Sequence, residues 1–347
     1  MTKKSLAVFG SLSCLFYMGV GSTQVTPQDD PMRLRMNVVL VQLNVAVTDS
    51  HGNYVTGLRP EDFSVTEDNI AQSVSTFEES RDSGPDAAVK AHGEQGKDSK
   101  SLANAIPKTT EANMFILFDT SNYMYRSFVF AQDAIADFIR SMDGSSRIAF
   151  YSYSRNLLRA TSLTPDPFQV INGVRTSVAG DDAALYNSLL LTVKDAAPLK
   201  GRKAVVVFSN GPDNASSVPP EDVAELAEST GTIIYILSTR QAQDDPASAA
   251  AFERVSKASG GKAYFAKDWR QEKKAFASIR EDLVHLYTLS YYPQSNPNRG
   301  WRSIKVKLVG KDLQKYHIRT RDGYRLLPGA ARSPDESAST NPGRESN

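Results

Sequence analysis

Apolar and polar residues alternate near the N-terminus of the chain. Val39, Val41, Leu43, Val45 and Val47 recur at every second position. A side-chain period of two is typical of a β-strand with one buried face. Three further short strands are expected in the same segment, over Tyr54–Thr56, Phe63–Glu67 and Ser73–Phe77.

The same alternation returns near the C-terminus, over Tyr287–Tyr291, Ile304–Leu308 and Tyr316–Thr320. Neither end has enough strands to cover its own apolar face, and each large side chain left exposed forgoes roughly 1.5–3 kcal/mol of burial. We therefore expect residues 32–79 and 286–327 to form one small β-sandwich. Its shared core should include Val41, Val45, Ile304 and Val306. Two separate β extensions are the alternative.

Between these ends, over residues 112–285, predicted strands alternate with predicted helices. Met114–Phe118 and Ala204–Ser209 are continuous apolar runs, as expected for strands buried on both faces. Further strands are expected over Arg147–Tyr153, Thr232–Leu237 and Lys262–Phe265. Helices are expected over Phe128–Met142 and Ala184–Ala196, after Pro219-Pro220, before Gly260, and around Phe276–Leu283. This order predicts an α/β domain with a doubly wound, mostly parallel, Rossmann-like sheet.

Three segments lack such patterns. Lys3 and Lys4 precede an apolar run that ends in Gly19-Val20-Gly21, which predicts a signal peptide over residues 1–21 and a secreted, periplasmic or cell-envelope location. An uncleaved anchor is the alternative, and no membrane span is expected in the mature chain. Residues 80–111 are expected to form a flexible linker and residues 328–347 a disordered tail.

Composition and charge narrow the classes of function. The chain is 40% hydrophobic and 23% charged, as in globular proteins. Its net charge of +1 gives no overall positive electrostatic field that would attract nucleic acid. The single cysteine, Cys14, lies inside the predicted signal peptide, so the mature chain would have no thiol for catalysis. Seven basic residues from Lys305 to Arg325 are expected to lie on a solvated strand face, with contact to a polyanion as the alternative.

Motifs that carry catalysis are absent from the sequence. None of the four histidines has the spacing of a metal-ligand pair, and there is neither a Gly-x-Ser-x-Gly elbow nor a phosphate-binding loop. The paired carboxylates Asp181 and Asp182 fall in a predicted loop. We therefore expect no enzymatic activity and no catalytic residues.

The first strand of the α/β region ends in Phe118-Asp119-Thr120-Ser121-Asn122-Tyr123. Ligands of doubly wound sheets bind at the carboxyl ends of the strands. Together with Ala184-Leu185-Tyr186, Val205–Gly211, Asp213–Ser216 and Gly323-Tyr324, this motif resembles the von Willebrand factor A (VWA) fold. Within that fold, the chain resembles in particular the acidobacterial VWFA-related group of exported proteins. The resemblance covers Asn37–Leu326.

The resemblance implies a metal-ion-dependent adhesion site with several of its ligands replaced. Asp119 and Ser121 match the family's Asp-x-Ser-x-Ser motif. Tyr123 stands at the second serine, Ala183 at the threonine and Asn210 at the later aspartate. Because Mg²⁺ prefers six oxygen ligands, we expect no metal and no other cofactor. Mg²⁺ held with the help of Asp181 or Asp182 is the alternative.

The function implied by the resemblance is a non-enzymatic, adhesion-type protein-binding module. Its binding face would comprise the adhesion-site positions and the loop beside them, namely Asp119, Ser121, Tyr123, Asp182, Ala183 and Asn210. The partner would be a protein that the sequence does not identify. The alternative is a structural subunit of a cell-envelope assembly, with the VWA domain as scaffold.

Overall fold

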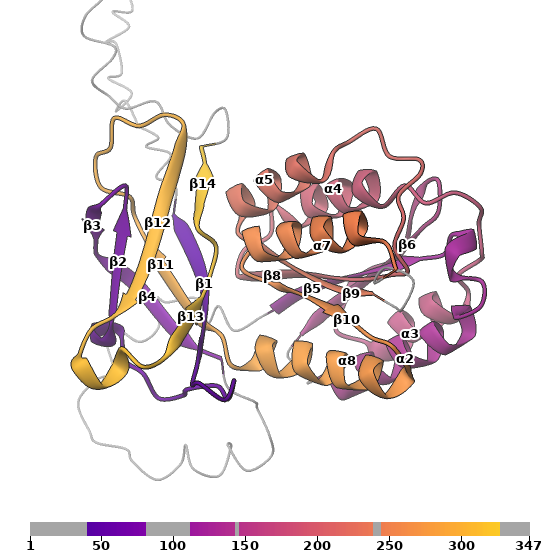
Figure 1. Cartoon of the computed structure of the whole chain (residues 1–347), viewed down its shortest axis with the longest axis horizontal. Helices are drawn as coiled ribbons and strands as arrows, with labels where there is room; N and C mark the ends of the chain where they lie inside the picture. The colour runs from indigo at the N-terminus through magenta and orange to yellow at the C-terminus, as the bar shows by residue number, and fades with distance from the viewer. Residues whose placement is uncertain (1–39, 81–111, 143–145, 239–243, 327–347) are drawn as a thin grey trace, which may run out of the picture. The chain divides into compact units, whose positions relative to one another are not determined.

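A computed structural model describes residues 40–80, 112–142, 146–238 and 244–326 (Figure 1). They belong to one compact unit that begins at Asn37. The predicted signal peptide, the linker beyond Ser80 and the predicted tail lie outside the described residues. Within the described residues, no helix has the length and apolar character needed to cross a bilayer.

The α/β domain is built on a six-stranded sheet with the strand order β10–β9–β8–β5–β6–β7. Its strands are β5 (Ala112–Asp119), β6 (Arg147–Tyr153), β7 (Leu157–Thr164), β8 (Arg202–Ser209), β9 (Thr232–Ser238) and β10 (Lys262–Phe265). All neighbouring pairs are parallel except β6 and β7. The predicted mostly parallel sheet is confirmed. The edge strand β7 was not predicted, because most of its side chains are partly or fully exposed and give no apolar run.

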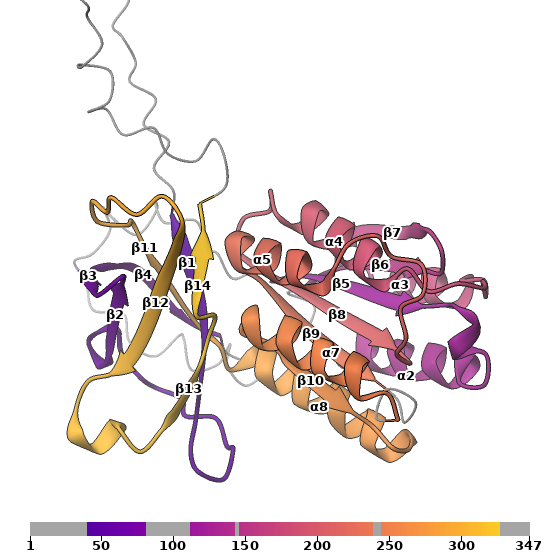
Figure 2. The same cartoon turned by 45° about the horizontal axis from the view of Figure 1, so that its top comes forward.

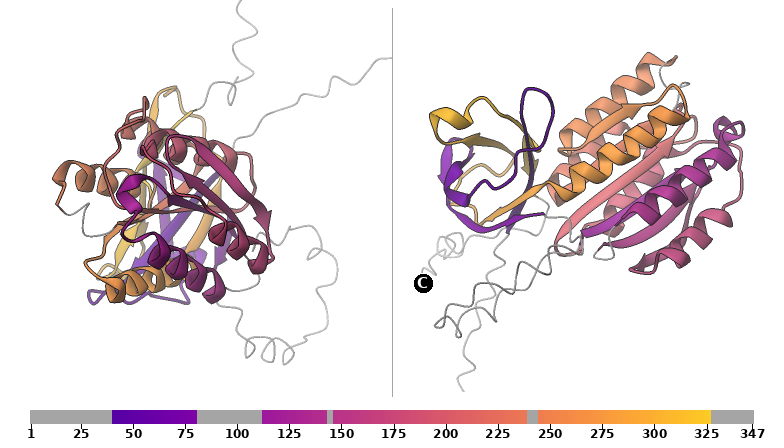
Figure 3. Two further views of the ribbon diagram at one scale, coloured as in Figure 1. Left: turned by 90° about the vertical axis from the view of Figure 1, so that its right-hand side faces the viewer. Right: turned by 90° about the horizontal axis from the view of Figure 1, so that it is seen from below.

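Helices cover both faces of this sheet (Figures 1 and 2). One face packs against α2 (Phe128–Ser141), α3 (Pro167–Arg175) and α8 (Trp269–Val284), and the other against α4 (Leu185–Ala196), α5 (Pro220–Thr230) and α7 (Pro246–Ala258). Successive residues of β5 serve the two layers: Ile116 lies in the first core and Leu117 in the second. The rings of Phe138 and Phe276 stack with centroids 4.8 Å apart and join α2 to α8, which run side by side in Figure 3.

Two four-stranded antiparallel sheets form the second domain, in the orders β13–β1–β11–β4 and β14–β12–β2–β3. The N-terminal strands are β1 (Val41–Thr48), β2 (Phe63–Glu67), β3 (Ile70–Gln72) and β4 (Val74–Glu79). The C-terminal strands are β11 (Tyr287–Tyr291), β12 (Trp301–Leu308), β13 (His317–Arg319) and β14 (Gly323–Arg325). Both sheets combine the two ends of the chain, since β1 pairs with β11 and β2 pairs with β12.

The predicted joint core is therefore confirmed, and the alternative of two separate extensions is wrong. Val41, Val45 and Ile304 lie in one buried cluster, and Val306 packs against it. The α/β domain is inserted between β4 and β11. The strand predicted over Tyr54–Thr56 is reduced to a single bridge between Thr48 and Tyr54. The short elements α3, β3 and β14 were not predicted.

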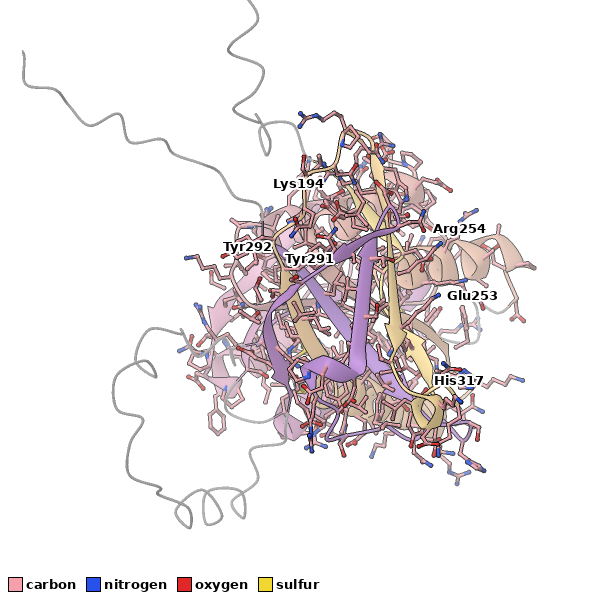
Figure 4. The ribbon with its side chains drawn as sticks, turned by 90° about the vertical axis from the view of Figure 1, so that its left-hand side faces the viewer. Lys194, Glu253, Arg254, Tyr291, Tyr292 and His317 are labelled. Carbon is pink, nitrogen blue, oxygen red and sulfur yellow. The ribbon has the colours of Figure 1, made fainter. Side chains whose placement is uncertain are left out.

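An ion pair lies inside the sandwich. Glu67, at the end of β2, has no exposed surface, and its carboxylate accepts a hydrogen bond of 2.8 Å from Arg302 on β12. The hydroxyls of Tyr291 and Tyr324 donate to the same carboxylate at 2.9 and 3.0 Å. Tyr291, the last residue of β11, is buried, whereas Tyr292, which follows the strand, is half exposed (Figure 4).

Candidate functional site

Three adjacent strands of the central sheet end where the sequence predicts a ligand face. β5 ends at Asp119, β6 at Tyr153 and β8 at Ser209, and both β6 and β8 pair with β5 in parallel. Parallel strands place their carboxyl ends at one edge of the sheet. We call this region the carboxyl edge.

Asp119 is completely buried at the carboxyl edge. One carboxylate oxygen accepts a hydrogen bond of 2.9 Å from the Ser121 backbone N–H, and the other accepts one of 2.7 Å from the Ser209 hydroxyl. The Tyr153 hydroxyl donates to Ser209 Oγ at 3.1 Å. Burial raises the pKa of Asp119, although these hydrogen bonds oppose the shift. Asp119 therefore links the ends of three strands, with Ser209 and Tyr153 as partners that the sequence patterns did not reveal.

Asn210 follows β8 and is only 2% exposed. Its side-chain amide donates a hydrogen bond of 2.7 Å to the backbone carbonyl of Tyr123. Tyr123 lies in the short 3-10 helix η2 (Asn122–Met124), and its ring packs against the core beneath α4, α5 and α7. The two residues thus fasten the loop after β5 to the end of β8, and the contact uses a donor that an aspartate lacks.

The loop before α4 is fastened in the same manner. The Ala183 N–H donates a hydrogen bond of 2.7 Å to Asn214 Oδ1. Asp182 forms an ion pair of 3.3 Å with Arg155, and its carboxylate accepts a hydrogen bond of 3.3 Å from the Asn214 amide. Asp213 accepts from the N–H of Tyr186 at 3.0 Å, in the first turn of α4. Ala183 is fully buried, so Asp182 and Tyr123 are the predicted face residues that retain exposed surface.

The groups at the carboxyl edge are a poor fit to a magnesium ion. Both oxygens of Asp119 accept hydrogen bonds from the protein, Ala183 has no side-chain oxygen, and the Tyr123 ring packs against the core. The buried hydroxyl of Ser121 is still a candidate ligand, because it has no hydrogen-bond partner among the described residues. In the same part of the chain, no three histidine, cysteine or acidic side chains gather as ligands. Mg²⁺ requires a near-octahedral set of oxygens, which these groups do not provide.

Exposed apolar side chains lie on the segment that follows β5 and on the loop after α3, next to the carboxyl edge. Tyr125 follows η2 and is 54% exposed, and the first turn of α2 presents Val129 and Phe130 at 63% and 69%. Val178 is 76% exposed and follows Ser177, whose hydroxyl accepts a hydrogen bond of 3.1 Å from Gln132 on α2. We call these four side chains the apolar rim. The sequence patterns did not reveal this rim, although the adjacent apolar residues Val129 and Phe130 on the outer face of a predicted helix were a signal that could have found it.

The chain is similar to several solved structures. No protein-family model and no curated protein matches the sequence. Among solved structures, the chain is similar to the conserved hypothetical protein BatB of Bacteroides thetaiotaomicron, with 14% identity, 50% of this chain and 97% of that chain covered, and a TM-score of 0.41. It is also similar to a von Willebrand factor type A protein of Catenulispora acidiphila, with 12% identity, 63% and 67% covered, and a TM-score of 0.43.

A third similar structure is the von Willebrand domain of a type V pilus tip protein from Porphyromonas gingivalis. Its identity is 12%, it covers 50% of this chain and 95% of its own, and its TM-score is 0.41. These likenesses concern the fold alone. The α/β layers are established by the strand order given above, and the chemistry of the carboxyl edge by its own contacts.

Proposed function

We propose that this chain is an exported, non-enzymatic, adhesion-type module that binds a protein partner at the carboxyl edge of its α/β domain. The apolar rim supplies the contact surface, and no bridging metal takes part. The observation that carries the proposal is the exposure of the rim side chains Tyr125, Val129, Phe130 and Val178 beside a fixed polar edge. The export component rests on Lys3, Lys4 and the apolar run that follows them.

A protein is the class of partner that suits this surface. Exposed aromatic and aliphatic side chains that gather beside polar groups are characteristic of protein–protein interfaces. Asp181 is exposed at the same edge, and its carboxylate accepts a long hydrogen bond of 3.4 Å from the Tyr125 hydroxyl. A partner surface with apolar side chains and a basic residue opposite Asp181 would complement both features.

The internal hydrogen bonds of the edge support a binding role without metal or catalysis. Asp119 and Asn210 are buried and engaged with Ser209 and Tyr123, so neither is available to activate a nucleophile or to coordinate a ligand. The same contacts fix the loops that carry the rim. A pre-organised surface loses less conformational entropy when it binds.

The proposal is tested by capture of partners from an envelope fraction with the purified protein as bait. The variants Phe130→Ser and Val178→Ser remove rim surface, and Val309→Ser removes an exposed side chain of the sandwich as a matched control. An interface anchor contributes about 2 kcal/mol or more, so the rim variants should weaken capture by more than tenfold, whereas the control should not.

Two outcomes would contradict the proposal. Equal capture by the rim variants and the unaltered protein would favour a structural subunit that uses the domain only as scaffold. Loss of capture on addition of a chelator, with recovery on addition of Mg²⁺, would show that a metal bridges the two proteins.

A further inference from the structure

A cleft lies at the amino ends of the central strands, opposite the carboxyl edge. It is bounded by the starts of β8 and β9 and by the sandwich strands β1, β4 and β11, and its volume is about 860 Å³. Gln42, Thr76 and Ser290 line it from the sandwich, and Lys203 and Gly231 line it from the α/β domain. A space of this size admits a small organic ligand.

Basic side chains outnumber carboxylates in its walls. The basic residues are Lys200, Arg202, Lys203 and Arg321, and the acidic ones are Glu78 and Glu79. Glu79 already accepts hydrogen bonds from the Gly57 N–H at 2.6 Å and from the Tyr287 hydroxyl at 3.1 Å. The cleft therefore carries an excess of positive charge.

Lys203 lies at the start of β8 and is largely withdrawn from solvent. Burial lowers the pKa of Lys203 to about 8, and the positive charge of Arg321 adds to the shift. No group in the described part of the chain accepts a hydrogen bond from its amine or pairs with it as an ion. A partly buried ammonium without a partner is unfavourable, and an oxyanion that accepts its hydrogen bonds would remove this cost.

Arg321 adds a second positive charge to the same wall. It is 6% exposed, and its guanidinium donates to the backbone carbonyls of Glu228 and, at 2.9 Å, of Gln42. Neither contact is with a carboxylate. Burial raises the pKa of the Glu228 carboxyl to about 7, so this acid compensates Arg321 only in part near neutral pH, and Glu67 is already paired with Arg302. The sequence pattern had placed Arg321 on a solvated face, which is wrong: it is buried and holds backbone carbonyls.

We propose that this cleft is a binding site for a small organic oxyanion, whose carboxylate or phosphate group accepts hydrogen bonds from Lys203 Nζ while Arg321 supplies positive charge from behind. The hydroxyls of Thr76 and Ser290 and the half-exposed ring of Tyr292 line the same space and suit the polar and planar parts of such a ligand. The site is separate from the carboxyl edge and does not depend on the partner proposed there.

The first test uses the reactivity of the Lys203 amine in the unaltered protein. At a pH near 8, where Lys203 is partly deprotonated, trinitrobenzenesulfonate should label it, and peptide mass spectrometry should locate the label. Inorganic phosphate and succinate serve as probes for the two anion classes. The probe that binds in the cleft should slow labelling of Lys203 severalfold. It should leave the labelling rate of Lys194, an exposed lysine on α4 (Figure 4), unchanged. If neither probe slows labelling at Lys203, the proposal is overturned.

The second test compares variants by calorimetric titration with the effective probe. Lys203→Gln removes one charge-assisted hydrogen bond and should weaken binding by about tenfold, whereas Lys203→Arg should retain most of the affinity. Lys194→Gln is the matched control. Unchanged affinity in Lys203→Gln would overturn the proposal even if the protein binds anions elsewhere. Partner capture at the carboxyl edge should be unaffected by Lys203→Gln, so that the two proposals fail separately.

Discussion

The side-chain amide of Asn210 donates a hydrogen bond of 2.7 Å to the backbone carbonyl of Tyr123. The two residues occupy positions where the VWA resemblance implies an aspartate and a serine that serve a metal ion. In this protein the two residues bind each other, since Asn210 supplies the amide donor and Tyr123 the carbonyl acceptor. This hydrogen bond fastens the loop that follows β5 to the end of β8, and an aspartate at position 210 would remove it.

Asn210→Asp should destabilise the protein. The variant loses the donor to Tyr123 and places a carboxylate oxygen against a carbonyl oxygen at a site that is 2% exposed. The loss of a buried hydrogen bond that leaves a group unsatisfied costs about 1–3 kcal/mol. Urea denaturation at neutral pH measures the change. Asn122→Asp, an exposed position in the neighbouring 3-10 helix, is the control and should change stability by no more than about 0.5 kcal/mol.

Magnesium should not bind at the carboxyl edge of the unaltered protein. Calorimetric titration with Mg²⁺ or Mn²⁺ at millimolar concentration should give no saturable heat. The triple variant Tyr123→Ser, Ala183→Thr and Asn210→Asp supplies two short hydroxyls and a carboxylate at these positions and should create or strengthen binding, at the cost in stability described above. Saturable binding by the unaltered protein would show that Asp181 or Asp182 supplies the missing ligand.

The layers of the fold could be predicted because burial leaves a pattern in the sequence. The central residues of β5 and β8, Met114–Phe118 and Ala204–Phe208, are all apolar, since helices cover both faces of these strands. In β1, apolar and polar or small residues alternate in the sequence, since one of its faces lies in the sandwich core. The elements that escaped prediction, β7 and β14 among them, are short or largely exposed. Their positions follow from pairing with a neighbouring strand, which is a long-range property.

The candidate site could be predicted in its location but not in its contacts. Asp119 and Asn210 follow apolar runs, so their place at strand ends was readable. The burial of Asp119 and its bond to Ser209, 90 residues away, depends on how β5 and β8 are paired. Lys203 looked like an ordinary polar residue at the start of a strand. Its partial burial beside Arg321 depends on the association of the two chain ends, which brings β13 and β14 next to the α/β domain.

The buried carboxyl of Asp119 should leave a pH-dependent mark on stability. Burial raises the pKa of Asp119 above its ordinary value of 3.8. The carboxyl of Asp119 therefore ionises at a lower pH in the unfolded chain than in the native protein. The native state therefore loses stability from about pH 4 upward, until the folded group ionises as well. Asp119→Asn lacks this titration. The free energy of unfolding of Asp119→Asn minus that of the unaltered protein should therefore become more positive as the pH rises through this range.

Urea denaturation at a series of pH values measures this difference. Asp312→Asn, at an exposed position of the sandwich, should show no such trend. A difference between Asp119→Asn and the unaltered protein that is constant with pH would mean that the native carboxyl titrates like the unfolded one.

Export should leave a mature N-terminus near Ser22. The predicted cleavage follows Gly19-Val20-Gly21, whose small residues suit a signal peptidase. N-terminal sequencing of the protein from the envelope or secreted fraction checks this. An intact Met1 in that fraction would contradict cleavage and favour the uncleaved anchor.

The ion pair between Glu67 and Arg302 should be essential to the union of the two chain ends. Glu67 comes from the N-terminal segment and Arg302 from the C-terminal one, and their side chains are 0% and 7% exposed. Arg302→Met would leave a buried carboxylate with three neutral donors, the hydroxyls of Tyr291 and Tyr324 and the Asn296 amide at 3.5 Å. Removal of one partner of a buried pair typically costs about 3–5 kcal/mol.

Chemical denaturation of Arg302→Met, Glu67→Gln and the double variant separates the contribution of the ion pair from the cost of leaving one charge buried without its partner. The double variant should be more stable than Arg302→Met, because it no longer buries an uncompensated charge. Arg140→Met, which breaks an exposed ion pair with Asp137 on α2, is the control and should change stability by less than about 1 kcal/mol. If Arg302→Met were no more destabilising than this control, the pair would not hold the segments together. Burial of the apolar side chains around Val45 and Ile304 would then be sufficient for their association.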